Sequence, residues 1–164
     1  MSVLVFADSS EGKFKKSALE VVSYGKKVAE LLGSNVAVLT VNATDASELH
    51  AYGAEKVVSV SNDNLKNFNA KAYASVVQQV AKAENATVVI IDSSVNGLYL
   101  APMVAVSLEA GYASNVVALP SEIAPFTVKR KTFSNKAFNN TVITTDVKVV
   151  GVAKNSYGVH ESAV

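Results

Sequence analysis

The sequence predicts an α/β fold of three layers (α/β/α), in which helices cover both faces of a mainly parallel sheet. Short apolar runs alternate with longer segments whose apolar residues recur every three or four positions, as in strands followed by helices. The run 88–91 consists of four β-branched residues, which is typical of a central strand buried on both faces. Beyond Gly111, β-type runs follow one another without helices, which indicates an antiparallel β appendage at the C-terminal end.

The first part of the chain predicts two strand–helix units and a third strand. Residues 2–7 are expected to form the first strand. Residues 15–32 carry an apolar stripe at helical spacing, and Gly33 follows the last apolar position, where helices commonly end in the left-handed conformation. The elements expected next are a strand at 35–41, a short helix at 47–52 stopped by Gly53, and a strand at 56–60.

After a polar loop at 62–69 come a helix at 70–84 and the central strand at 87–91. The helix that follows is constrained by Pro102, which has no backbone N–H. Either this helix starts late, with Pro102 in its first turn, or Asn96 caps it and Pro102 removes one hydrogen bond and bends the axis. The late start distorts the helix less, so we expect it.

Four further strands are predicted at 114–119, 126–133, 141–145 and 147–153. A parallel return to a neighbouring strand needs a crossover of a dozen or more residues, so strands joined without helices are normally antiparallel. We therefore expect five β/α units in the sheet order 3-2-1-4-5, followed by about three antiparallel strands.

The composition excludes several classes of protein. With 49% hydrophobic and 18% charged residues, the chain is not disordered. The net charge of +1 gives no reason to expect nucleic acid or an anionic membrane as a partner. The absence of cysteine excludes disulfides, thiolate catalysis and cysteine-ligated metals. No apolar run approaches a membrane span, and no leader precedes the strand that begins at Ser2, so we expect a cytoplasmic protein.

The inventory of reactive side chains predicts no catalytic residue and no metal site. The two histidines, His50 and His160, are not spaced with other ligands for a metal, and His160 lies in the non-periodic tail 154–164, which we expect to be the least ordered segment. The glycines satisfy neither common phosphate-binding motif. Asp8 lies where a nucleophilic aspartate could lie but lacks a paired second aspartate, so an enzyme acting through Asp8 is a third-rank hypothesis.

Two polar turns, 8–10 and 92–97, follow the first and fourth predicted strands. In the order 3-2-1-4-5 these strands are neighbours at the switch point, so the two turns should line one crevice. The hydroxyls and amide of this crevice and a helix N-terminus suit the ribose and phosphates of an adenine nucleotide, although the same residue types also cap helices and form turns. Neither turn contains lysine or arginine. The candidate nucleotide-binding residues are Ser93, Ser94, Asn96 and Gly97.

Segments spread over nearly the whole chain match one family. Residues 51–57 resemble the motif YGADKV, and residues 93–102 resemble TSxxGRDLAPR, with Gly97, Leu100, Ala101 and Pro102 retained. Further matches lie at 3–8, 12–13, 17–20, 114–116, 126–133 and 149–157. On these residues the chain resembles the N-terminal domain of the α subunit of electron-transfer flavoproteins.

The chain also departs from the family pattern. Leu98-Tyr99 stands where the motif has Arg-Asp, and Met103 stands where it has arginine. Segments 134–136 and 153–155 also differ from the usual Gly-Asn-Ala and Arg-Pro-Gly. Because arginines are the natural partners of phosphate, these changes weaken the nucleotide interpretation without affecting the buried pattern of the fold.

The resemblance implies an adenine-nucleotide-hydrolase-like domain that acts as a scaffold for heterodimerisation and supports FAD-mediated electron transfer from dehydrogenases to an acceptor. In the family FAD lies mainly on the C-terminal domain of the α subunit, and AMP lies in the β subunit, so no cofactor is expected in this chain alone. The implied partners are the β subunit and the C-terminal FAD domain. The resemblance also implies bounds for the domain. Residues 1–154 would form the domain and 155–164 the start of a linker. We expect the partner at 126–145, where Phe133 and Phe138 should be exposed.

The main alternative is a stand-alone adenine-nucleotide-binding module of the universal-stress-protein type. It would hold the nucleotide with Ser93, Ser94 and Asn96 at the switch point.

Overall fold

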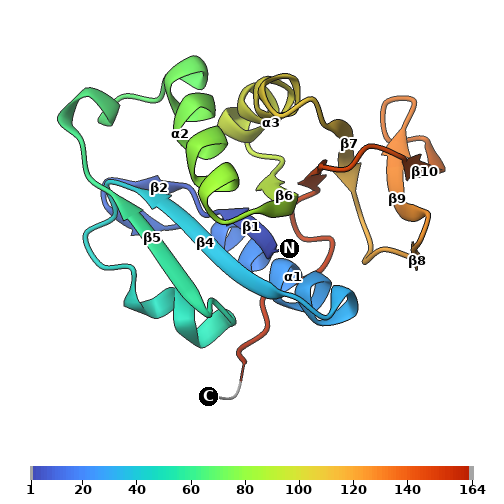
Figure 1. Cartoon of the computed structure of the whole chain (residues 1–164), viewed down its shortest axis with the longest axis horizontal. Coiled ribbons are helices and arrows are strands. Elements are labelled where there is room, and N and C mark those ends of the chain that lie inside the picture. Colours follow the sequence, from blue (N-terminus) through green and yellow to red (C-terminus); the bar gives the residue numbers. More distant parts are fainter. Residues whose placement is uncertain (1, 163–164) are drawn as a thin grey trace.

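A computed structural model describes residues 2–162 of the chain. In this part, nine strands form one sheet, and helices lie on both of its faces (Figure 1). The main-sheet strands are β1 (Ser2–Phe6), β4 (Asn35–Val41), β5 (Lys56–Val60), β6 (Ala86–Asp92), β7 (Gly111–Val116), β8 (Glu122–Ile123), β9 (Phe126–Thr132), β10 (Ala137–Ile143) and β11 (Lys148–Val152). The remaining elements are the β2–β3 hairpin (Ser9–Ser10, Lys13–Phe14), the helices α1 (Lys16–Leu32), α2 (Ala70–Ala83) and α3 (Val95–Ser107), and the 3-10 helices η1 (Ser47–Tyr52) and η2 (Asp63–Leu65).

The three-layer architecture with a mainly parallel sheet is confirmed, because each central strand is buried on both faces. Val3 and Val5 of β1 pack with α1 on one face, and Leu4 and Phe6 pack with α2 and α3 on the other. This alternation follows from the period of two residues along a strand. Burial on both sides explains why β1 is an uninterrupted apolar run.

The sheet has the order β10-β9-β7-β11-β6-β1-β4-β5. The five predicted strands keep their expected relative order, but β11 lies between the fourth, β6, and the fifth, β7, and is parallel to both. The expectation that the last strand is antiparallel was therefore wrong, whereas β9 and β10 are antiparallel as expected.

A short connection to β11 suffices because β10 and β11 are not neighbours in the sheet. The end of β10 lies beside the start of β7: a Cβ on Gly111 would lie 2.6 Å from Cγ2 of Ile143, and Thr145 Oγ1 accepts the Gly111 N–H at 2.7 Å. The chain thus leaves β10 already close to the level at which β11 begins, and no crossover helix is needed. The expectation that strands joined without a helix are antiparallel holds for strands that are neighbours in the sheet. β10 and β11 are not neighbours, because β9 and β7 lie between them.

The helix after β6 does not start late. It begins at Val95, and its N-cap is Ser94, whose Oγ accepts the Gly97 N–H at 3.1 Å. Pro102 therefore lies inside α3 and gives up one intrahelical hydrogen bond. A serine N-cap is worth about 1 kcal/mol, which offsets part of that loss. The left-handed Gly33 that closes α1 agrees with the prediction, whereas β7 and β10 begin three and four residues before their predicted starts.

The tail that we expected to be the least ordered segment makes fixed contacts with the domain over the residues that are described. Residues up to 162 pack back on α1 and η1: the Glu20 carboxylate accepts the N–H of Tyr157, and Ser162 donates its N–H to Ala51. The final residues 163 and 164 of the predicted tail lie outside the described part of the chain.

Candidate functional site

The two polar turns meet at the carboxyl edge of β1 and β6, as the sequence predicts. Asp8 follows β1, and Asn96 lies in the first turn of α3, which follows β6. Asn96 Nδ2 donates a hydrogen bond of 3.2 Å to Asp8 Oδ2. The strand order places β1 next to β6, so side chains 88 residues apart in sequence line the same crevice.

Ser94 and Gly97 build the start of α3. Ser94 Oγ donates to Asp92 Oδ1 at 2.7 Å while it accepts the Gly97 N–H. A Cβ on Gly97 would lie 1.9 Å from the Asp92 carbonyl oxygen, so only glycine allows the helix to approach the strand end this closely. These contacts account for both residues as a cap and a close packing position, without a ligand.

Ser93 is the one candidate with a buried side-chain atom that lacks a hydrogen-bond partner among the described residues. Its backbone N–H donates to the Val152 carbonyl of β11 at 2.9 Å, which fixes its backbone. Its Oγ is buried and has no hydrogen-bond partner among the described residues. Ser93 is therefore positioned by β11, a strand that the predicted order did not place there.

Two lysines that the sequence analysis missed also line the crevice. Lys15 precedes α1, and Lys154 follows β11; both face a cavity of about 180 Å³ together with Asp8 and Asp92. Lys154 reaches this place only because β11 lies beside β6. Although neither turn contains lysine or arginine, the crevice therefore holds two cationic and two acidic side chains.

Burial and neighbouring charges act together on Asp8 in the crevice. Burial raises the pKa of Asp8, and the nearby charge of Asp92 raises it further, while the hydrogen bond from Asn96 and the charge of Lys15 act in the opposite direction. The net result is a pKa above the ordinary aspartate value. A second carboxylate beside Asp8 disfavours bound phosphate, because the two like charges would face it.

The crevice is small for a nucleotide. Its volume of about 180 Å³ is below the range of roughly 300–1,000 Å³ that is usual for small-molecule sites. A neighbouring cavity of about 380 Å³ is lined by residues that include Ser9 and Tyr73. Their hydroxyls are already used: Ser9 donates to the Val41 carbonyl at 2.6 Å, and Tyr73 donates to the Leu65 carbonyl at 2.8 Å.

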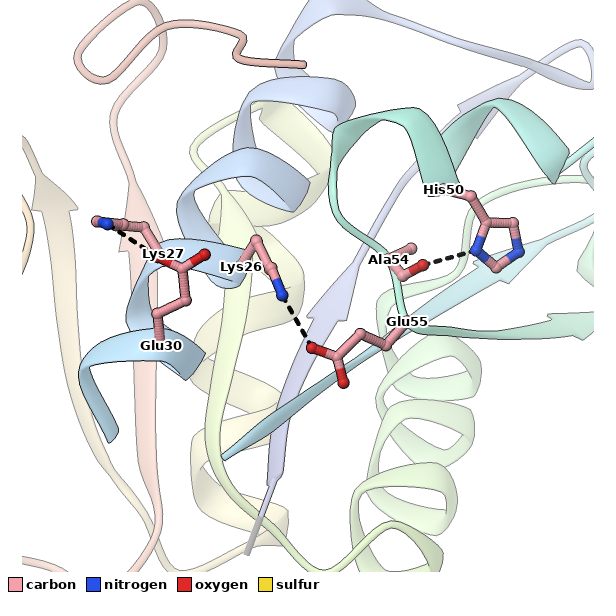
Figure 2. Close-up of polar contacts among 6 residues, drawn as sticks. All are labelled: Lys26, Lys27, Glu30, His50, Ala54 and Glu55. Carbon is pink, nitrogen blue, oxygen red and sulfur yellow. Dashed lines mark hydrogen bonds and ion pairs between the residues drawn. The ribbon is translucent and has the colours of Figure 1, made fainter. Parts of the chain in front are cut away.

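The two histidines lie away from this crevice. In Figure 2, the His50 ring at the end of η1 points toward the Ala54 carbonyl, 2.6 Å from Nδ1, beside the ion pair of Lys26 and Glu55 at 3.0 Å. The His160 ring packs against Tyr157 with the ring centroids 4.9 Å apart. Within residues 2–162, no cluster of three or more acidic or histidine side chains is arranged to hold a metal ion.

The most unusual surface of the domain is a row of exposed apolar side chains on α3. We call it the α3 stripe, and it consists of Val95, Leu98, Tyr99, Met103 and Val106. Val106 is 80% exposed and Tyr99 is 66% exposed. The helix has no charged residue, so it is apolar all round, a pattern that is typical of a helix covered on every side. Leu98, Tyr99 and Met103 are also the positions where the chain departs from the charged residues of the motif.

A second exposed apolar group lies on the β9–β10 hairpin, where Phe133 is 80% exposed and Phe138 is 61% exposed. The expected exposure of these two side chains is confirmed. Their role toward a partner stays a prediction.

The fold and the crevice together define a doubly wound α/β domain with a small switch-point crevice and uncovered apolar surfaces. Residues 3–163 match the family model described as electron transfer flavoprotein domain. The chain therefore belongs to the electron transfer flavoprotein domain family, as its sequence motifs indicated.

Curated relatives point to the α subunit within this family. The chain is 30% identical over 124 residues to the electron transfer flavoprotein subunit alpha of Clostridium acetobutylicum, which covers 74% of the chain and 37% of that protein. It is 28% identical over 151 residues to the subunit alpha of Bacillus subtilis, which covers 88% of the chain and 44% of that protein. The chain thus spans about two-fifths of the length of these relatives.

Another relative carries a different name. The chain is 32% identical over 120 residues to the acryloyl-CoA reductase electron transfer subunit beta of Anaerotignum propionicum, a match that covers 71% of the chain and 33% of that protein. Between residues 2 and 162, no helix has both the length and the hydrophobicity that crossing a bilayer requires.

Proposed function

We propose that this chain is the N-terminal scaffold domain of an electron-transfer flavoprotein α subunit, which packs against a β subunit and supports electron transfer by FAD held elsewhere. The observation that carries the proposal is the α3 stripe. Burying apolar surface contributes roughly 25 cal/mol per Å², so a row of exposed aliphatic and aromatic side chains favours association with another protein. Membership of the family makes the β subunit the natural partner.

The crevice supports a structural role rather than a flavin site. Its volume of about 180 Å³ does not fit FAD, and two carboxylates would face the pyrophosphate. We infer that FAD binds to a C-terminal domain, for which the greater length of the relatives leaves room. In this proposal residues 1–154 are the scaffold, and residues 155–164 lead toward that domain. The chain itself contributes a rigid surface, and we assign it no catalytic residue.

Co-expression tests the proposal. A tagged chain is co-expressed with an electron-transfer flavoprotein β subunit, and the complex is measured by affinity capture and size exclusion. Tyr99→Lys with Val106→Lys should abolish co-purification, because two charges would be desolvated in the interface. Leu31→Lys is the matched control, since Leu31 is 45% exposed on α1, away from the α3 stripe, and this variant should bind normally. Retention of the β subunit by the double variant would disprove the assignment of this surface.

Adenine-nucleotide binding is a second candidate, which Lys15 and Lys154 favour because they supply cations that the turns themselves lack. Calorimetry with AMP and with ATP tests it. Binding heat that is lost in Lys154→Ala would support a nucleotide module, and no heat at millimolar ligand would remove this candidate.

A further inference from the structure

The β9–β10 hairpin leaves one edge of the main sheet open. β10 is the last strand in the sheet order, and in Figure 1 it lies at the end of the molecule opposite β5. Among residues 2–162, only β9 forms backbone hydrogen bonds with β10. The outward N–H and C=O groups of β10 are therefore available to another strand.

β10 lacks the usual protection of an edge strand. Its seven residues, Ala137–Ile143, include no charged residue and no proline. Edge strands normally contain lysines, prolines or bulges, which prevent pairing with another chain. An open and uncharged edge can pair with a strand of another chain. The opposite edge of the sheet, β5, begins with Lys56, which forms an ion pair of 2.6 Å with Glu84.

The hairpin has an apolar and cationic outer face. Phe138 lies directly opposite Lys131, and Asn140 lies opposite Lys129, so these side chains share one face. Lys129 Nζ lies 4.6 Å from the centroid of the Phe138 ring, which places a cation beside an exposed aromatic side chain. Val142, on the same face, is 49% exposed. The other face is buried only at the base of the hairpin, where Phe126, Val128 and Ile143 pack in the core, whereas Ala137 and Asn139 are exposed.

The charge of the β9–β10 hairpin and its flanking residues indicates which kind of partner it would bind. Residues 123–145 contain four cationic side chains, Lys129, Arg130, Lys131 and Lys136, and no acidic one, while the adjacent Glu122 of β8 pairs with Thr127 at the base of β9. Pairing of two copies through β10 would bring their cations together, which opposes a homodimer. An acidic partner would be attracted. Only a polypeptide strand can also form backbone hydrogen bonds with the outward N–H and C=O groups of β10. A lipid surface or a nucleic acid cannot add to the sheet in this way.

We propose that β10 binds an extended acidic segment of another protein, which adds to the sheet as a further strand. Its backbone pairs with the free edge of β10, its apolar side chains pack against Phe138 and Val142, and its carboxylates lie near Lys129 and Lys131. This docking surface is distinct from the α3 stripe and does not depend on the β subunit assignment.

The probe is a short synthetic peptide of alternating glutamate and valine with blocked ends. Binding is measured by fluorescence polarisation, and its location by hydrogen exchange of the backbone amides. We expect saturable binding that weakens with salt and protects amides within 137–143. Lys129→Glu with Lys131→Glu should weaken binding by roughly tenfold or more, because two attractions become repulsions.

Matched controls separate the hairpin from net charge and from folding. Lys71→Glu makes the same kind of charge change on the exposed side of α2 and should leave binding unchanged. Val142→Glu places a negative charge on the exposed side of β10, where it repels an acidic strand, so it should strongly weaken binding while the thermal unfolding midpoint stays near that of the native chain.

Four outcomes would overturn the proposal. The first is the absence of protection at 137–143 in the presence of the peptide. The second is equal binding of a lysine–valine peptide, which would show that charge does not select the partner. The third is tighter binding of phosphatidylserine vesicles or single-stranded DNA at the hairpin. The fourth is a dimer of the free chain that Val142→Lys dissociates.

Discussion

The Glu20 carboxylate accepts a hydrogen bond of 2.9 Å from the backbone N–H of Tyr157, a residue 137 positions further along the chain. The same oxygen accepts the Gly158 N–H at 2.9 Å, and the other oxygen accepts the Asn155 N–H at 2.9 Å. Ser23 adds a pair of hydrogen bonds to the backbone of His160. One turn of α1, from Glu20 to Ser23, thereby fixes the path of the C-terminal segment across the face of the domain.

Glu20→Gln should loosen this segment. The glutamine amide has a single acceptor oxygen and presents N–H groups to backbone N–H groups, so at least one buried donor loses its partner. Glu20 is only 2% exposed, and we expect a loss of about 1–3 kcal/mol in the free energy of unfolding, with faster hydrogen exchange of the amides at 155–158. Glu30→Gln is the control: Glu30 pairs with Lys27 at 2.8 Å on the exposed side of α1 (Figure 2), and its loss should be small. Equal effects of the two changes would contradict the role of Glu20.

The attachment of the segment should also depend on pH. Burial acts to raise the pKa of Glu20, but the backbone N–H groups of Gly158, Tyr157, Asn155 and Ser156 outweigh it, so the pKa lies below the ordinary value. A depressed pKa in the folded state contributes stability above the unfolded pKa of about 4.3, and this contribution is lost as pH falls through the folded pKa.

Urea unfolding across the acidic range measures this effect. The stability difference between the native chain and Glu20→Gln should be constant at neutral pH and shrink below pH ~4. A difference that stays constant through that range would show that ionisation of Glu20 does not hold the segment.

Asp8→Asn should stabilise the domain at neutral pH. Burial and the Asp92 charge raise the pKa of Asp8, so the folded state favours the protonated form, and stability is lost as pH rises from the unfolded pKa of about 3.9 through the folded one. Asparagine has no charge to desolvate, and its oxygen can still accept the hydrogen bond from Asn96. Chemical unfolding at pH 7 and at pH 3 should show the gain mainly at pH 7. Asp146→Asn, on the exposed surface, is the control and should show no such gain.

Gly97→Ala should destabilise the domain by about 1–3 kcal/mol, because the new methyl group would overlap the Asp92 carbonyl and force α3 away from β6. Gly33 provides the comparison. Its surroundings are open, but its φ is +60°, so Gly33→Asn should be tolerated better than Gly33→Ala. Thermal unfolding of the variants checks both expectations, and a neutral Gly97→Ala would show that the close approach of α3 to β6 is not required.

Several features of the fold could be predicted because they depend on neighbouring residues. The uninterrupted apolar run of β6 indicates a strand buried on both faces, and the spacing of apolar residues in α1 indicates one buried helical face. Gly33 and Gly53 mark helix ends because glycine adopts the left-handed conformation without steric cost. The juxtaposition of Asp8 and Asn96 followed from the general order of such sheets.

By itself, the sequence determined the fold class, the main elements, the family and the meeting of the two polar turns, since burial periodicity and turn chemistry are local properties. Only the tertiary structure decided that β11 lies between β6 and β7, that Lys154 therefore enters the crevice, and that Glu20 holds the C-terminal segment. Each of these depends on which distant segments become neighbours. The packing of the whole sheet decides which distant segments become neighbours, and no local pattern of residues predicts it.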